Sequence, residues 1–203
     1  MATTKRKTVM FMGRSGSGKG TQAKFIVEAL KAATNRPVFY LESGQSFRDF
    51  IAHGGYSARL SKAVMDQGEL QPSFLAVWNW SHLLVENLTG EEHMIIDGTP
   101  RSLEEAKVLD TALAFYGLAP FAFVYLNVSP TEGKKRLQLR ARADDQTDEK
   151  IDERFRWFEE SVMPVIEHYR SHPDCRFVEI DGDPDIETVT KSITDNLTDY
   201  LNS

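Results

Sequence analysis

Apolar and polar positions follow two distinct patterns along the chain. Short runs of almost uninterrupted apolar residues, typical of buried parallel strands, alternate with longer segments in which apolar residues recur at helical spacing. The five runs are 8–12, 37–41, 93–97, 121–128 and 176–180, and the strongest helical patterns are 19–33, 102–116, 130–141, 148–170 and 185–201. This alternation predicts an α/β fold in which right-handed crossover helices cover both faces of a five-stranded parallel sheet.

The stretch between the second and third runs, roughly 43 to 92, is too long for one crossover helix. It is expected to carry several helices and to form an insertion over one edge of the sheet. No internal repeat, low-complexity tract or linker interrupts the 203 residues. A single domain over 1–203 is therefore predicted.

The charged and apolar residues of the chain limit the kinds of partner that it can bind. With 24 Lys and Arg against 30 Asp and Glu, the chain has no general positive field for nucleic acid or anionic lipid, so any anion site must be local. No apolar run reaches membrane-spanning length, and the basic N-terminus is too short in apolar residues for a secretion signal. The single cysteine, Cys175, excludes an internal disulfide and a multi-cysteine zinc cluster. We expect a cytoplasmic protein that binds neither nucleic acid nor membrane.

Glycines cluster directly after the first strand, in the segment GRSGSGKG at 13–20. Its spacing fits G-x-x-x-x-G-K, and a predicted helix begins near Lys19, which is the context that this motif requires. The backbone N–H groups of such a loop form a concavity for anions, and the lysine supplies an ammonium to the outer phosphates. The pattern predicts a polyphosphate nucleotide site rather than a flexible turn. Gly20 stands where Ser or Thr usually holds magnesium, and Thr21 follows it.

Phosphoryl transfer needs in-line placement of its reactants and cationic charge on the transferring group, for which arginine is well suited. Arg136 and Arg140 lie four residues apart on a predicted helix, hence on one face, although a solvated charged face is the alternative. Arg101 follows the third strand at the carboxyl end of the sheet, where open α/β folds bind ligands. Asp97 ends that strand and can either hold magnesium through water or form a turn before Gly98.

These motifs together resemble the nucleoside monophosphate kinases, and the adenylate kinases in particular. The resemblance rests on GSGKGTQ at 16–22, DGTPRSLEEA at 97–106 and RLQLRARADD at 136–145. Further matches follow in the family's order at 42–50, 64–72, 158–169 and 178–189, so the likeness covers nearly the whole chain. It implies a three-layer P-loop kinase fold with a helical NMP-binding insertion at 43–72. It also implies a lid at 140–146 that is truncated to little more than a turn.

By resemblance, the activity is ATP-dependent phosphoryl transfer to a nucleoside monophosphate, with AMP as acceptor, by a monomer that uses Mg²⁺ with ATP and no zinc. The implied ATP-binding residues are Gly13, Ser15, Gly16, Ser17, Gly18, Lys19, Gly20, Thr21, Arg136 and Gly182. The implied NMP-binding residues are Ser43, Gly44, Arg48, Gly98, Arg101, Glu105, Arg142 and Arg154. Lys19, Arg101, Arg140, Arg142 and Arg154 are implied to be catalytic, and Asp97 to hold Mg²⁺ through water.

Two departures from the family, the truncated lid and Glu105, leave alternatives open. Glu105 occupies the position of a base-reading glutamine, and an ionised carboxylate, which only accepts hydrogen bonds, suits guanine better than adenine. A solvated glutamate at the start of a helix is the other interpretation. A UMP/CMP or GMP kinase and a catalytically weak nucleotide-binding regulator therefore remain alternatives, whereas a metabolite kinase would share only the glycine loop.

The histidines do not suggest a further site. They are His53, His82, His93, His168 and His172. Their positions show no metal-ligand spacing with one another, and each is expected to be an ordinary surface or core residue.

Overall fold

The computed structural model describes residues 5–140 and 147–203. Its five strands form one parallel sheet in the order β2-β3-β1-β4-β5. The strands are β1 Thr8–Met12, β2 Val38–Glu42, β3 His93–Asp97, β4 Phe121–Asn127 and β5 Cys175–Asp181. Every residue of the central strand β1 is buried, as its unbroken apolar sequence predicts for a strand covered on both faces. The α/β prediction is confirmed.

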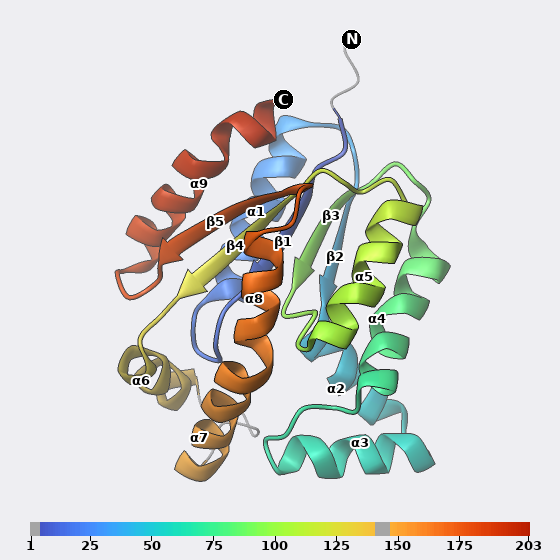
Figure 1. The fold of residues 1–203 in the computed structure, drawn as a ribbon, viewed down its shortest axis with the longest axis vertical. Helices are drawn as coiled ribbons and strands as arrows, with labels where there is room; N and C mark the ends of the chain where they lie inside the picture. The colour runs from blue at the N-terminus through green and yellow to red at the C-terminus, as the bar shows by residue number, and fades with distance from the viewer. Residues whose placement is uncertain (1–4, 141–146) are drawn as a thin grey trace.

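Helices cover both faces of this sheet, so the molecule has three layers (Figure 1). On one face, α1 Lys19–Ala33 and α9 Ile186–Asn202 pack through residues such as Ile26 and Ile193 onto Phe11. On the other face, Trp80 and Leu109 belong to the core cluster. The covering helices there are α4 Ser73–Asn87, α5 Leu103–Phe115 and α8 Met163–Arg170. The two apolar clusters fix the sheet between rigid layers.

The segment between β2 and β3 forms several helices, as predicted. They are α2 Ser43–His53, α3 Tyr56–Asp66 and α4. The predicted helix at 148–170 is also present, but it contains a π-helical turn, Phe158–Val162, between α7 Asp148–Trp157 and α8. Helix α6 Pro130–Arg140 precedes the predicted lid. Most of that lid, including Arg142, lies outside the described residues.

The carboxyl ends of the strands face α2, α3, α6 and α7, which gather at one end of the molecule (Figure 1). In an open parallel sheet this is the end where ligands bind, because the chain passes from each strand into the following helix there. No helix among the described residues is both long and apolar enough to cross a membrane.

Candidate functional site

A cavity of about 990 Å³ opens at the carboxyl end of the sheet. It is lined by the loop after β1, the first turns of α2, the end of β3, α6, α7 and the loop after β5. The predicted site residues that line it are Gly13, Ser15, Gly16, Ser17, Gly18, Lys19, Gly20, Thr21, Ser43, Gly44, Arg48, Asp97, Gly98, Arg101, Arg136, Arg140, Arg154 and Gly182. Glu105 is not among the lining residues, and Arg142 is not described.

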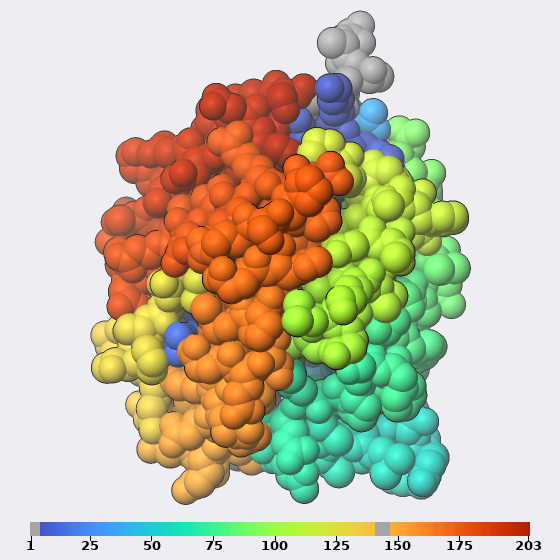
Figure 2. Space-filling view, in the orientation of Figure 1, coloured from blue at the N-terminus to red at the C-terminus, as the bar shows by residue number. Residues whose placement is uncertain are grey.

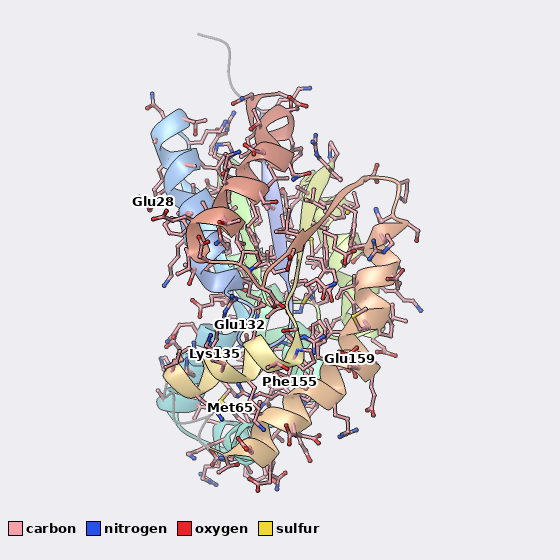
Figure 3. The ribbon with its side chains drawn as sticks, turned by 90° about the vertical axis from the view of Figure 1, so that its left-hand side faces the viewer. Glu28, Met65, Glu132, Lys135, Phe155 and Glu159 are labelled. Atoms are coloured by element: carbon pink, nitrogen blue, oxygen red, sulfur yellow. The ribbon has the colours of Figure 1, made fainter. Side chains whose placement is uncertain are left out.

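The glycine loop turns tightly between β1 and α1. The backbone N–H of Ser17 donates to the carbonyl of Arg14 at 3.1 Å, and Gly18 caps α1. Gly16 has a φ of +84°, and a Cβ at this position would overlap the carbonyl oxygen of Gly133 in α6. Figure 3 shows α6, with Glu132 and Lys135 labelled, lying across this end of the molecule beside Phe155 of α7. The loop is therefore pressed against α6, which only glycine permits at this point.

Gly20 gives room to the carboxylate of Asp97. A Cβ at Gly20 would lie 3.1 Å from Asp97 Oδ2, so the side chain of Asp97 fills part of the space that a Ser or Thr would enter. The hydroxyl of Tyr40 donates to the same oxygen at 3.0 Å. Asp97 Oδ1 is buried and has no hydrogen-bond partner in the described parts of the chain. Burial raises the pKa of Asp97, and the nearby Lys19 ammonium opposes that rise.

Lys19 lies among other cations. The pKa of its ammonium is lowered to about 8, first by burial and then by the charges of Arg101, Arg140 and Arg154, while Asp97 opposes the change. Its Nζ donates to the Arg14 carbonyl at 3.4 Å, a long contact. A group of cations that depress one another's proton affinity is stabilised when a polyanion enters between them. The electrostatics of the cavity therefore suit a phosphate-rich ligand.

A second group of side chains lies where β3 meets α2. Arg101 donates from Nε to the carbonyl of Gly98 at 2.8 Å and from Nη2 to Ser43 Oγ at 3.3 Å. Its guanidinium lies over the ring of Trp157, 5.6 Å from the centroid. Ser43 Oγ in turn donates to the Gly98 carbonyl at 2.8 Å. These contacts hold the Arg101 fork at the edge of the cavity.

Arg48 reaches the cavity from the insertion. Its Nη2 donates to Glu42 Oε1 at 3.2 Å and to Gln45 Oε1 at 2.9 Å. Both partners belong to the same short segment as Arg48, around the start of α2. The guanidinium is thus aligned within its own segment and needs no contact from the opposite wall of the cavity.

Arg136 binds the loop that follows β5. It donates to the carbonyls of Gly182, Asp183 and Pro184 at 2.8, 2.9 and 3.1 Å. A fourth hydrogen bond, from Nε to Glu132 Oε1, is 2.9 Å long. This residue therefore joins α6 to the carboxyl end of β5, and it lines the cavity between them.

Three residues that contribute to the site were not foreseen from the sequence. They are Tyr40, which contacts Asp97, Trp157, which lies under Arg101, and Arg14. Arg14 is buried, lies over the rings of Phe155 and Phe158, and donates to Glu159 at 2.9 Å. It ties the glycine loop to α7 and the π-helical turn. Tyr40 and Trp157 lie outside the motifs, and Arg14 stands at a variable position of the glycine loop, so only the tertiary fold brings each to its partner.

Glu105 is buried, with 4% of its surface exposed, so its interpretation as a solvated glutamate is wrong. Its Oε2 accepts a hydrogen bond from Thr99 Oγ1 at 3.4 Å. Burial raises the pKa of this carboxyl, and the neighbouring Arg101 opposes the shift. The role of Glu105 in reading an acceptor base stays a prediction.

The chain was compared with protein families and with known proteins, and the matches agree with one another. The sequence profile of the adenylate kinase family matches residues 11–173. The chain is 29% identical to the adenylate kinase of Petrotoga mobilis, with 95% of this chain and 98% of that protein covered. It is 31% identical to an adenylate kinase of Dehalococcoides mccartyi, with 91% and 95% covered. The corresponding figures for the Flavobacterium johnsoniae adenylate kinase are 30% identity and coverage of 93% and 98%.

Proposed function

This chain belongs to the adenylate kinase family, and on that premise we propose that it transfers the γ-phosphoryl group of ATP to AMP. In this reaction an oxygen of the AMP phosphate bonds to the γ-phosphorus while the bond to the β–γ bridging oxygen breaks. Two molecules of ADP result, and the enzyme takes part in nucleotide biosynthesis. Because the matched relatives are adenylate kinases, the alternative of a UMP/CMP or GMP kinase is not favoured.

The observation that carries this proposal is the concentration of cations in one cavity of a protein with a net charge of −6. We assign ATP to the glycine loop, whose backbone N–H groups and Lys19 would bind the β- and γ-phosphates. We assign AMP to the side of Ser43, Arg48 and Arg101. Arg140 and Arg154, which line the same cavity, would stabilise the charge that develops on the transferring group.

Mg²⁺ is the expected companion of ATP, and Asp97 fits it. The carboxylate is buried beside the loop, and its Oδ1 lacks a partner in the described residues, as a group reserved for a cation or its water would. A bound Mg²⁺ would supply neutralisation of the phosphate charge. The contribution of the chain is to orient this carboxylate through the hydroxyl of Tyr40, 3.0 Å from Oδ2.

A cytoplasmic location and a monomeric state are part of the proposal. The single cysteine, Cys175, is a free thiol, which suits a protein that needs no oxidising compartment. Apart from Glu105 and Arg142, the predicted ATP and NMP ligand residues line one cavity of a single chain, which supports a reaction carried out by one copy.

A coupled assay of ADP formation tests the function directly. The purified protein is incubated with ATP, Mg²⁺ and each of AMP, GMP, CMP and UMP. AMP should give the highest kcat/KM. The variant Lys19→Met should keep the fold but lose at least ~10²-fold in kcat, because it removes a cation aimed at the transferring group. Turnover of Lys19→Met at the wild-type rate would contradict the mechanism, and inert AMP beside an active pyrimidine or guanine nucleotide would contradict the acceptor.

A further inference from the structure

Three possible metal ligands meet outside the nucleotide cavity, where α5 packs beside α8. Asp110 belongs to α5, His168 to α8, and His172 follows the end of α8. One ligand atom from each side chain lies within 4.8 Å of the other two. The expectation that the histidines show no metal spacing therefore does not hold for His168 and His172. Figures 1 and 2 show the two helices side by side on one face of the molecule.

Holding an ion requires two hydrogen bonds to give way, the one between His168 and Asp110 and the one from the Asp174 backbone N–H to His172 Nδ1, which is 3.2 Å long. His168 Nε2 lies 2.8 Å from Asp110 Oδ2, and the rings of His168 and His172 have their centroids 5.8 Å apart. Ligand atoms around a tetrahedral Zn²⁺ are separated by roughly 3.3 Å, as follows from metal–ligand distances near 2.0–2.1 Å. The hydrogen bond between His168 and Asp110 would thus open by about half an ångström to admit the metal.

The Asp110 carboxylate lies between α5 and α8, with one oxygen on His168 and the other turned inward. Its Oδ1 is buried, and the buried hydroxyl of Tyr169 interacts with the same carboxylate. The Asp110 and His168 side chains are 22% and 28% exposed, so an ion can reach the group from solvent.

We propose that Asp110, His168 and His172 bind one Zn²⁺ ion, with water completing its coordination. Two imidazoles and one carboxylate suit this borderline-soft cation, whereas Mg²⁺ prefers oxygen ligands alone and stays with ATP. The Cys175 thiol, although in the same region of the fold, does not belong to the ligand group. The ion would join α5 to α8, which cover the same face of the sheet, and would stabilise the folded state.

The test uses the full-length chain without an affinity tag, stripped with EDTA and titrated with Zn²⁺ by isothermal calorimetry. We expect one ion per chain. The apparent Tm should rise by roughly 5–10 °C when Zn²⁺ is at about 100-fold its Kd, because the ion binds the folded state only. Titration with Co²⁺ should give the visible absorption of a four-coordinate ion with nitrogen and oxygen ligands.

His172→Gln is the principal variant, because His172 lies at the end of α8 and is not fully buried. It should weaken the Kd for Zn²⁺ at least ~10-fold while the metal-free Tm stays close to that of the wild type. Asp110→Asn should act in the same direction. His53→Gln removes an exposed imidazole at the end of α2 and should bind like the wild type. Equal Kd values for wild type and His172→Gln, or no binding to the wild type, would overturn the proposal.

Discussion

At the scale of the single residue, Lys19 connects the electrostatics of the cavity to a pH profile. Its pKa is lowered to about 8, so the free enzyme loses this ammonium as the pH rises through that value. We expect kcat/KM for ATP to fall about tenfold per pH unit above pH 8, because this parameter reports the free enzyme. The kcat should fall only at higher pH, since a bound triphosphate restores the proton affinity.

The matched control is Lys19→Arg, whose guanidinium stays protonated throughout this range. Whatever its absolute rate, its kcat/KM for ATP should not show the fall above pH 8. A wild-type profile that is flat to pH 10 would mean that Lys19 keeps its charge in the free enzyme.

Glu105 gives a prediction about stability. Burial raises the pKa of Glu105 in the folded state. At pH values between its unfolded pKa and its folded pKa, the native state therefore binds more protons than the unfolded state. The free energy of unfolding consequently falls as the pH rises through this range. Glu105→Gln removes this dependence. The change in free energy of unfolding caused by the substitution, measured in urea, should be more favourable at pH 8 than at pH 4.5. Glu104→Gln, at an exposed neighbouring position, should show no such difference.

The sequence allowed some residue roles to be predicted and not others. The glycine loop, Asp97 and Arg101 belong to local patterns whose chemistry follows from a few consecutive residues. Tyr40 is 57 positions from Asp97 in the chain, and only the pairing of β2 with β3 brings its hydroxyl to the carboxylate. The proposed metal ligands Asp110, His168 and His172 also could not be predicted from the sequence, because only the packing of α5 beside α8 brings them together.

At the scale of the element, the close approach of the glycine loop to α6 can be tested with Gly16→Ala. The backbone at Gly16 has a φ of +84°, and the added methyl would overlap the Gly133 carbonyl. We expect a loss of roughly 2–4 kcal/mol in the free energy of unfolding, from backbone strain and the displacement of α6 together. ATP affinity should fall as well, because the loop would move.

Gly90→Ala separates the two contributions. Gly90 has a φ of +93°, but a Cβ there meets no atom within 4 Å, so this variant carries the backbone strain alone. Urea denaturation of both variants measures the difference, which we attribute to the contact between the loop and α6. Equal losses would mean that α6 yields to the methyl group without cost.

The order of strands and helices was predictable because apolar periodicity decides it. The predicted strands agree with the observed ones to within a residue or two at their ends. The π-helical turn Phe158–Val162 was not foreseen within the predicted helix 148–170. A change from α to π hydrogen bonding leaves no clear mark on periodicity, since it depends on how Phe158 and Val162 pack against the core.

At the scale of the whole molecule, the two walls of the cavity should serve different substrates. Arg48 comes from the insertion and Arg101 follows β3, whereas the glycine loop follows β1. Arg48→Ala and Arg101→Ala should each raise KM for AMP more than KM for ATP, by about 10-fold or more. Steady-state kinetics with each substrate varied in turn measures both constants.

Arg36→Ala is the control for that experiment, because Arg36 lies between α1 and β2 and bonds Glu91 at 2.9 Å, away from the cavity lining. It should leave both constants unchanged. If the variants of Arg48 and Arg101 affect ATP and AMP equally, then the assignment of AMP to this wall is wrong.

The last prediction concerns water. A cavity of about 990 Å³ must be shielded from water during transfer. The sequence between α6 and α7 is short for a lid, and only one alanine separates Arg140 from Arg142. We therefore expect slow hydrolysis of ATP alongside transfer, because water reaches the γ-phosphate more easily under a short cover. Release of inorganic phosphate from ATP and Mg²⁺ without AMP measures it, with Lys19→Met as the background. Transfer should remain faster than hydrolysis when AMP is added. Phosphate release no greater than that of Lys19→Met would show that the insertion and α6 exclude water without a longer lid.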